Sequence, residues 1–524
     1  MHERSSPVIL SYRQFQRLKL EFITREMMKK KVYIIGAGIA GLTAGSYLQM
    51  NDYDTKIFEA HTIAGGLCTG WRRKEFIFDG CVHSTIGPNK KYRLNRWFSE
   101  LIDFSKIDYH YFNELGKIVL NSGDEFIFYI DPEKLEAELK KVAPEDEKFI
   151  KSFVKGIKAF SKYDMQISKP IELWNPLDYF LSQFKTAPYI YYLSKWSESI
   201  ETCVNKCKNP IMKKIINQDF FSRFPAYFLL ISIAQMHAKS AGYPTGGSLK
   251  FTKLLEEKYN KSGGKIHFNS KVIKVLEEND NAIGISLENG KNLEDADIVI
   301  SAADGYTTIF SMLDGKYTDK EINKRYKNHP KWPSVVLVSL GIGREFKNES
   351  PNIELSLKNG ITIDNSTKTY TIPITIYNFD PTLASKGKTC IRVILHTYNF
   401  KFWNELKQNN PEKYIYEKER ISNEVIDILE NYFGNIKKYL EVIDVATPAT
   451  FKRYTGNWQG SIQGWEWLPG LIPEHIKHTL PGLKNFYITG QWVMPGGGIS
   501  GAFINARDLS RIICAKDKKK FRSI

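Results

Sequence analysis

The chain has 524 residues and a formal net charge of +16, with 74 lysines and arginines against 58 aspartates and glutamates. This length exceeds one ordinary hydrophobic core, so two or more domains are expected. No run reaches the roughly 18 to 20 apolar residues that a membrane-spanning helix needs. The lysines are scattered along the chain and no zinc-finger or RNP motif is present, which argues against a nucleic acid partner.

Residues 1–28 precede the first predicted strand and lack the apolar core of a secretory signal. We interpret them as an N-terminal extension, either a surface helix or an over-long reading frame. The six cysteines lie far apart in the sequence, except for Cys203 and Cys207. They are interpreted as free thiols of a reducing cytoplasm, and no metal site is predicted. The expected location is cytoplasmic, and the basic surface would also suit peripheral contact with a membrane.

The segment from Lys31 to Glu59 has the pattern of a dinucleotide-binding unit. An apolar strand (32–35) leads into Gly36-x-Gly38-x-x-Gly41, a helix from about Ile39 to Met50, and a second strand (55–58) that ends at the acid. The glycines permit a tight turn, close approach of a pyrophosphate and close helix–strand packing, and Glu59 can accept the ribose hydroxyls. The predicted cofactor-binding residues of this segment are Gly36, Gly38, Ile39, Ala40, Gly41, Glu59 and Ala60.

A Gly65-Gly66 pair follows the acid, and a short strand (76–79) comes next. From here the chain resembles the FAD-dependent phytoene desaturase, carotenoid isomerase and retinol saturase branch of the amine oxidase superfamily. The resemblance implies that Gly65 and Gly66 bind FAD and that the loop 79–84 faces the flavin. His83 in this loop is the single candidate for a catalytic polar role, although an isolated histidine is more often structural.

One position departs from the family pattern. Many relatives have an arginine directly after the glycine pair, where this chain has Leu67. Arg72 or Arg73 could make the phosphate contact instead.

Two later segments complete the predicted cofactor site. Residues 242–304 contain a helix (248–260) and several strands, and by resemblance the backbone of Val272 pairs with the adenine. Near the C-terminus, a strand (486–489) and Gly496-Gly497-Gly498 precede a second helix, whose N-terminal dipole would face the flavin. By resemblance this is the C-terminal flavin motif, with Gly490, Gly498, Ile499 and Ser500 as binding residues.

The remaining segments predict a second domain. A hairpin (116–130), strands at 334–341, 369–377 and 389–398, and a helix at 411–433 indicate an antiparallel sheet flanked by helices. Aromatic residues crowd the helices between Phe149 and Trp196, where they would form either a core or a tunnel for an apolar substrate. Residues 225–236 are too short to cross a membrane and are interpreted as a buried helix or pocket wall.

The predicted fold is α/β, with a Rossmann-like FAD-binding domain and an inserted α+β substrate domain that contains the antiparallel sheet. The FAD domain is expected to comprise residues 29–90, 235–310 and 441–524, and the substrate domain residues 91–234 and 311–440. The resemblance implies an FAD-dependent oxidoreductase that acts on a small hydrophobic substrate, a polyene or isoprenoid, by desaturation, saturation or cis-trans isomerisation. The alternatives are an amine oxidase-like flavoenzyme and an FAD-binding protein without turnover. The oligomeric state is left open.

Overall fold

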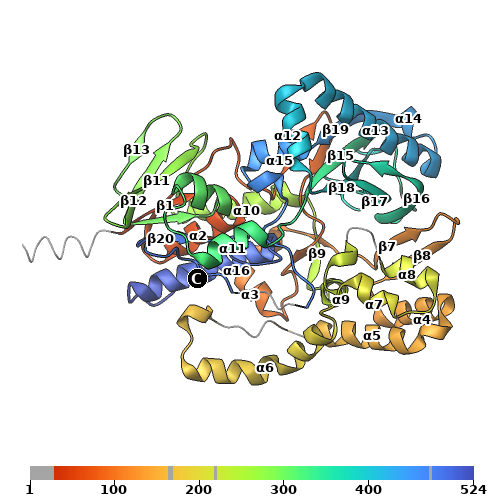
Figure 1. Ribbon diagram of the computed structural model, residues 1–524, viewed down its shortest axis with the longest axis horizontal. Helices are drawn as coiled ribbons and strands as arrows, with labels where there is room; N and C mark the ends of the chain where they lie inside the picture. The colour runs from red at the N-terminus through yellow and green to blue at the C-terminus, as the bar shows by residue number, and fades with distance from the viewer. Residues whose placement is uncertain (1–28, 163, 165–168, 218–220, 471–474, 524) are drawn as a thin grey trace, which may run out of the picture.

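The computed structural model describes residues 29–162, 164, 169–217, 221–470 and 475–523, so the predicted extension at residues 1–28 lies outside the described residues. The chain forms a parallel sheet with its helices on one side of the molecule and a larger, mainly antiparallel sheet on the other, with a group of helices below the larger sheet in the view of Figure 1. This arrangement is the predicted α/β fold.

The parallel sheet brings together three distant stretches of the chain. Its strand order is β10-β2-β1-β14-β20, and all neighbouring strands run parallel. The strands are β1 (Lys31–Ile35), β2 (Asp54–Phe58), β10 (Lys265–His267), β14 (Ile298–Ser301) and β20 (Phe486–Ile488). These three stretches are the ones that the sequence predicts for the FAD domain.

The parallel sheet is buried on both faces, as its apolar strands require. Val32 and Ile34 of β1 belong to the core that includes three helices, whereas Tyr33 and Ile35 point to the opposite face. The helices are α2 (Ile39–Met50), α10 (Gly247–Lys261) and α16 (Gly498–Lys516). A small antiparallel sheet covers the opposite face and contains β11 (Val272–Glu278), β12 (Asn281–Leu287) and β13 (Asn292–Leu293).

The second large sheet has the order β19-β15-β18-β17-β16-β7-β8 and is antiparallel except where β16 meets β7. Its strands are β7 (Glu114–Val119), β8 (Glu125–Tyr129), β15 (Ser334–Ile342), β16 (Asn352–Thr362), β17 (Lys368–Ile376), β18 (Thr389–Thr397) and β19 (Leu440–Ala446). Strand β19 pairs with β15, although we grouped residues from 441 onward with the FAD domain. Helices α12 (Phe400–Asn409) and α13 (Pro411–Phe433) supply Trp403 and Leu429 to the core on the outer face.

Five of the helices that lie in the sequence between β8 and β15 pack together in a separate hydrophobic core. They are α4 (Pro132–Val142), α5 (Glu147–Ser161), α7 (Ile200–Asn205), α8 (Pro210–Ile216) and α9 (Ala226–His237). Phe153, Phe160 and Trp196 are buried in this core, so these members of the aromatic stretch are packing residues. Among the helices within the described ranges, none combines the length and apolar character needed to cross a bilayer.

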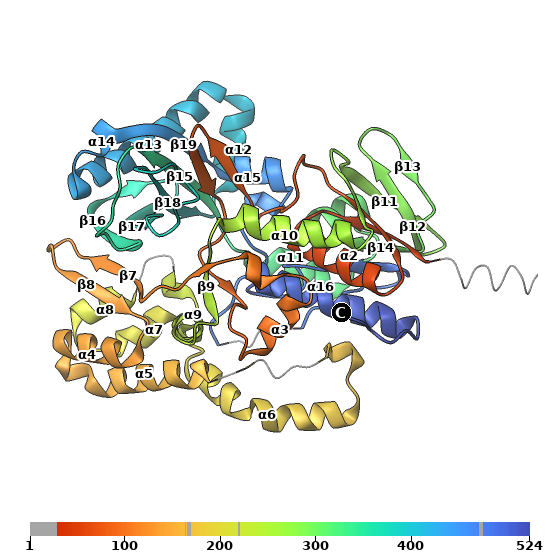
Figure 2. The same cartoon turned by 180° about the vertical axis from the view of Figure 1, so that it is seen from behind.

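Shorter elements connect these layers. They include β3 (Gly70–Arg73), β4 (Phe76–Asp79), β5 (Thr85–Ile86), α3 (Arg93–Ser99), β6 (Tyr109–His110), β9 (Ala241–Pro244), α11 (Lys320–Asn328), α14 (Ile436–Tyr439) and α15 (Pro448–Thr455). Helix α6 (Pro176–Lys195) runs along the bottom edge of the molecule in both Figure 1 and Figure 2. It therefore lies at the periphery of the fold.

Candidate functional site

The first glycine turn has the geometry of a phosphate-binding helix start. Gly36 adopts φ +96° and donates its N–H to the Phe58 carbonyl. A methyl group on Gly41 would lie 1.9 Å from the Gly36 carbonyl oxygen, so only glycine lets α2 approach the turn this closely. Gly38 differs, because a methyl group there would meet no atom closer than 3.8 Å. Space is therefore available in front of the first turn of α2.

The N-terminal amides of α2, including those of Ile39 and Ala40, are available to a ligand. Gly38 provides no side-chain cap to the helix, and the first turn holds no acidic residue. These uncapped N–H groups and the helix dipole together favour an anion.

The Gly65-Gly66 loop lies directly against the first turn. The Gly65 N–H donates to the Ala37 carbonyl over 2.9 Å, and Gly65 and Gly38 form an isolated parallel bridge. A methyl group on Gly66 would lie 3.5 Å from the Gly38 Cα. The structure thus brings the two predicted glycine motifs together.

Glu59 and the chain around Val272 form one end of the site. The Glu59 carboxylate is 8% exposed and accepts the N–H of Ala37 over 2.7 Å and that of His61 over 2.9 Å. Each of these oxygens retains a lone pair for a hydroxyl donor. The Ser270 N–H donates to the Glu59 carbonyl, which places the start of β11 and its buried Val272 beside the acid. Ala60 follows Glu59 at an exposed position.

The C-terminal glycine motif meets the N-terminal one. Helices α2 and α16 pack through Ala40, Ala44 and Ala506. They run in parallel, because Ala40 and Ala44 in the first half of α2 pack on Ala506 in the middle of α16, and Tyr53, just after α2, donates to Asp517, just after α16. A methyl group on Gly490 would lie 3.2 Å from the Ala40 Cβ. Both helix N-termini therefore point toward the same end of the parallel sheet.

The start of α16 is also uncapped and open. Gly497 provides no side-chain cap, no acid lies in the first turn, and a methyl group on Gly498 would have no atom within 4 Å. Ile499 and Ser500, the next two residues, are only partly buried. Two buried oxygens in this region, Gln463 Oε1 and Thr489 Oγ1, have no hydrogen-bond partner among the described residues. Two open helix starts, an acid with free lone pairs and unsatisfied polar atoms fit a dinucleotide with a redox ring.

The loop 79–84 is held in place by Asp79. Its buried carboxylate accepts five hydrogen bonds, from the N–H groups of Cys81, Val82 and Ser248, the Ser248 hydroxyl and the Tyr243 hydroxyl. A methyl group on Gly247 would lie 2.1 Å from Asp79 Oδ2, so α10 begins with glycine at the point of closest approach. The sequence shows Asp79 only as the end of a strand, and the donors from Tyr243 and Ser248 come from a segment more than 160 residues away.

Arg392 of β18 connects the loop 79–84 to the second sheet. This role of Arg392 was not predicted from the sequence. Its guanidinium is 2% exposed, donates to the Asp79 carbonyl over 3.0 Å, and lies 3.0 Å from His83 Nδ1. Since an arginine can only donate, His83 Nδ1 accepts and the ring proton lies on Nε2. The residue is exposed to solvent at the edge of the loop, but desolvation by the surrounding protein, then the charge of Arg392 and the nearby His396, holds the pKa of His83 well below its usual range. His83 is therefore a neutral imidazole with one N–H to offer.

Leu67, which stands where many relatives have an arginine, and Arg73 both contact the second sheet. Leu67 packs with Leu337 and Phe451 between the two sheets. The Arg73 guanidinium donates to Asp444 of β19 over 2.8 Å, which commits it to the second sheet. Arg72 lies at an exposed position. The backbone N–H groups are left as the main phosphate donors on this side.

A second cluster of polar side chains surrounds the buried Glu466. Arg223 and the Tyr398 hydroxyl both donate to Glu466 Oε1, and the guanidinium lies 4.3 Å from the centre of the Tyr398 ring. His396 lies two residues before Tyr398 in the sequence, and burial lowers the pKa of His396 to about 3. Arg392 and His396 lie four residues apart in the apolar strand β18, so their side chains share one face of the sheet. This spacing was the sequence signal that could have indicated a polar site on that face.

Glu466 gives a prediction for the pH dependence of stability. Burial raises its pKa to about 7, with Arg223 opposing the shift. Between about pH 4.5 and pH 7 the folded protein therefore holds a proton that the unfolded chain has released, so the free energy of unfolding falls as the pH rises through this window. We expect the free energy of unfolding, measured by urea denaturation, to fall between pH 5 and pH 8. The fall should be about 2 to 3 kcal/mol larger in the wild type than in Glu466→Gln. The exposed control Glu412→Gln should follow the wild type, and identical losses in all three proteins would contradict the prediction.

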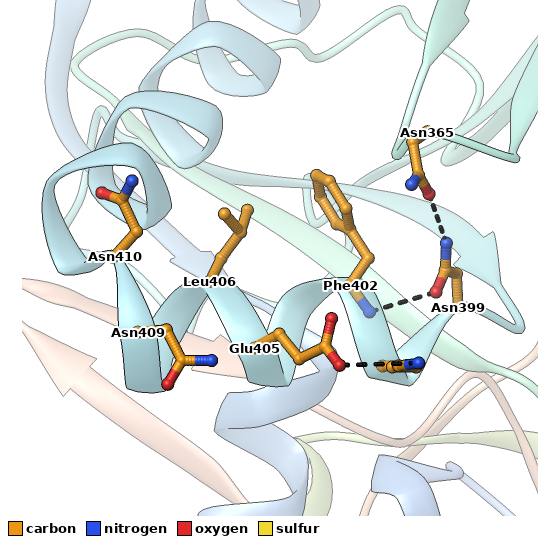
Figure 3. Close-up of a pocket in the computed structure, with 8 residues that line it drawn as sticks. Asn365, Asn399, Phe402, Glu405, Leu406, Asn409 and Asn410 are labelled. Atoms are coloured by element: carbon orange, nitrogen blue, oxygen red, sulfur yellow. Dashed lines mark hydrogen bonds and ion pairs between the residues drawn. The ribbon is translucent and has the colours of Figure 1, made fainter.

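A shallow pocket lies elsewhere, on the outer side of α12 (Figure 3). Its asparagines have structural partners: Asn399 accepts the Phe402 N–H and donates to Asn365 over 2.7 Å. Helix α12 lies far from α2 and α16 in Figure 1. We therefore do not associate this pocket with the cofactor site.

The fold and the paired glycine motifs define a dinucleotide-binding flavoprotein. A family model described as flavin containing amine oxidoreductase matches residues 39–514, so the chain belongs to this family and is an FAD-dependent oxidoreductase. This confirms the resemblance that the sequence indicated.

Curated relatives are similar over most of their length. The inactive all-trans-retinol 13,14-reductase of Danio rerio is 24% identical over 93% of this chain and 87% of its own. The prolycopene isomerase of Daucus carota is 23% identical (89% and 77%), and the 4,4'-diapophytoene desaturase of Methylomonas is 23% identical (94% and 97%).

Solved structures share the fold. An oxidoreductase from Methanosarcina mazei has a TM-score of 0.56 at 16% identity, covering 92% of this chain and all of that one. Putrescine oxidase bound to putrescine also has a TM-score of 0.56, at 13% identity, covering 93% of this chain and 99% of that one.

Proposed function

We propose that the protein acts on a long apolar polyene or isoprenoid, which it desaturates, saturates or isomerises. The observation that carries this proposal is an aromatic cluster, here called the aromatic wall, next to the C-terminal glycine motif; Phe228 and Trp467 are partly exposed in it, and Phe224 and Trp332 are buried behind them. The wall consists of Phe224 and Phe228 of the α9 region with Trp332 and Trp467, whose rings pack 4.8 Å (Phe224–Trp332) and 5.4 Å (Phe228–Trp467) apart. A methyl group on Gly496 would lie 1.9 Å from Trp467 Nε1, so the wall reaches the start of α16. The names of the curated relatives, which include carotenoid desaturases and isomerases, support the same substrate class.

The geometry of the site supports the following cofactor assignments. In this proposal Gly36, Gly38 and Gly41, with the amides of Ile39 and Ala40, hold the diphosphate. Glu59 and Ala60 bind the ribose, and Val272 binds the adenine. Gly65, Gly66, Gly490, Gly498, Ile499 and Ser500 contact the rest of the FAD. Bound flavin exchanges a hydride with a substrate that is positioned over it and shielded from water.

His83 is assigned a positioning role within this site. Arg392 holds its Nδ1, so the neutral ring presents Nε2–H as a hydrogen-bond donor. A donor fixed in this way can orient a ligand but cannot take up a proton at neutral pH, because its pKa is well below its usual range.

Anaerobic mixing of the flavin-loaded protein with candidate substrates tests the proposal. Loss of flavin absorbance near 450 nm with a polyene, or conversion of the polyene in extracts resolved by chromatography, is the expected result. Phe228→Asp should weaken this response because it places a charge in the aromatic wall, whereas Phe126→Leu in the remote hairpin should not. Reduction by amines alone, or by neither class of compound, would overturn the proposal.

We further propose that α6 contacts the surface of a membrane, from which an apolar substrate would be drawn. Leu177, Phe180 and Tyr191 are 60%, 59% and 60% exposed on this helix. Their spacing of three and eleven residues places them along one side of a helix. An apolar helix side of this kind, on a chain of charge +16, suits an anionic lipid interface.

Co-sedimentation with liposomes tests this contact. Wild-type protein should bind vesicles that contain anionic lipid at low salt, and replacing Leu177, Phe180 and Tyr191 by serine should lower the bound fraction at least about fivefold. Ile415 and Tyr416 on α13 are similarly exposed, at 54% and 60%, so their serine variants provide the matched control. Equal binding by both sets of variants would contradict the role of α6.

A further inference from the structure

Two cysteines that are distant from each other in the sequence analysis lie opposite each other in the structure. Strands β3 and β4 pair antiparallel with Gly70 opposite Asp79, and the Gly80 N–H extends this ladder by donating to the Thr69 carbonyl over 3.0 Å. The next pair in the same register is Cys68 and Cys81. Both cysteines are free thiols in the structure, as the sequence analysis expected, but they are neighbours rather than far apart.

The backbone at this pair suits a disulfide. The Cys68 N–H donates to Gly65 and the Cys81 N–H to Asp79, so neither amide takes part in the ladder. In a continued antiparallel ladder, residues at such a non-hydrogen-bonded position would have Cα atoms about 4.5 Å apart with their side chains close together. The paired residues end at Gly70 and Asp79, so this separation is what the register implies for Cys68 and Cys81, and it falls within the range that a disulfide spans.

The two thiols are neighbours but differ in access. The Cys68 thiol donates to the Ser248 carbonyl over 3.9 Å. Cys68 is buried, with 3% exposure, whereas Cys81 is partly exposed. Interaction with the neighbouring Cys68 thiol, followed by burial, raises the pKa of the Cys81 thiol well above its usual value. The pair is therefore stable as two thiols near neutral pH and reacts faster at higher pH.

The pair joins two loops of the cofactor site. Cys68 follows the Gly65-Gly66 loop by two residues, and Cys81 belongs to the loop 79–84. We propose that Cys68 and Cys81 form a reversible disulfide that fastens these two loops around the FAD. This inference goes beyond the proposed activity, because it concerns the retention of the cofactor and requires no substrate.

A low-molecular-weight disulfide, such as oxidised glutathione, is a sufficient oxidant. The thiolate of Cys81 attacks one sulfur of oxidised glutathione, forms a mixed disulfide and releases one glutathione thiolate. The thiolate of Cys68 then attacks the Cys81 sulfur and releases the second glutathione. In total the two cysteines lose two protons and two electrons, and oxidised glutathione gains them.

Thiol mapping of the full-length, FAD-loaded protein tests the inference. After incubation with oxidised glutathione at pH 8.5, non-reducing peptide mass spectrometry should find the peptides of Cys68 and Cys81 joined, and dithiothreitol should separate them. FAD release on dilution, followed by flavin fluorescence, should be at least about fivefold slower in the oxidised protein. Cys68→Ser and Cys81→Ser should show neither the link nor the slowing.

Cys203 and Cys207 provide the internal control, since both are buried and close in sequence. Their peptides should not become joined under the same conditions, because Cys203 lies in α7 and Cys207 just beyond its end, and the two do not face each other across an antiparallel pair. Unlinked Cys68 and Cys81, or glutathione attached to Cys81 alone, would overturn the disulfide. A link that leaves FAD release unchanged would overturn its role in retention.

Discussion

Asp79→Ala should yield a protein that retains no flavin and whose free energy of unfolding is lower by about 3 to 5 kcal/mol. The carboxylate accepts five hydrogen bonds from buried or partly buried donors, and alanine would leave most of them unpaired, since only the Val82 N–H has a second acceptor, the Ser248 hydroxyl. Each unsatisfied buried donor costs about 1 to 3 kcal/mol, but the costs do not add fully because the loop can relax. The loop 79–84 would move, and with it the Gly247 start of α10.

The ratio of absorbance at 450 nm to that at 280 nm measures the flavin, and urea denaturation measures the stability. Asp79→Asn preserves the size of the side chain and one acceptor oxygen, so its loss should be intermediate. Asp124→Ala in the exposed hairpin turn should behave as the wild type. If Asp79→Ala matched Asp124→Ala in both measurements, the loop would not depend on this carboxylate.

Gly41→Ala should lower the stability of the protein, whereas Gly38→Ala should lower its affinity for FAD. The Gly41 methyl group would lie 1.9 Å from a backbone oxygen that cannot rotate away, so α2 must shift and the free energy of unfolding should fall by about 3 kcal/mol or more. The Gly38 methyl group meets only an ordinary contact, and Gly38 has φ −73°, which alanine adopts readily. The Gly38→Ala apoprotein should therefore be as stable as the wild type.

The flavin separates the two variants. The Gly38 methyl group would occupy the space in front of α2, so the dissociation constant of FAD should rise at least about 100-fold, or about 2.7 kcal/mol. Titration of the apoprotein with FAD, followed by quenching of flavin fluorescence, measures this change. Unchanged FAD affinity in Gly38→Ala would remove the diphosphate from this turn, and normal stability in Gly41→Ala would show that α2 need not approach Gly36.

The elements that carry the glycine motifs could be predicted because their signals are local. The strand, glycine turn and helix at 31–50 follow one another within a few residues, and α2 begins and ends at the predicted residues. Helix α13 likewise spans the predicted 411–433, because Pro411 and an asparagine cap mark its start and Gly434 marks its end. The proximity of the two glycine motifs was inferred from their order along the chain.

Contacts between distant segments could not be predicted from the sequence. Strand β16 is interrupted by polar residues and a bulge, so its alternation is weak, and β19 joins the second sheet through pairing with β15 that nothing local specifies. Arg392 and Glu466 acquire their roles from partners more than two hundred residues away. The Cys68–Cys81 pair depends on the register of a hairpin, which a single-residue shift would abolish.

The position of β20 at the edge of the parallel sheet affects how the protein is synthesised. This strand and α16 are made after the other elements of the parallel sheet, yet β20 pairs with β14 and α16 packs on α2. While it is still on the ribosome, the nascent chain therefore exposes the apolar edge of β14 and has only one of the two helix starts. Such an edge is a site for aggregation, so we expect the growing polypeptide to need chaperone protection until β20 and α16 have been synthesised, and FAD to enter only afterwards.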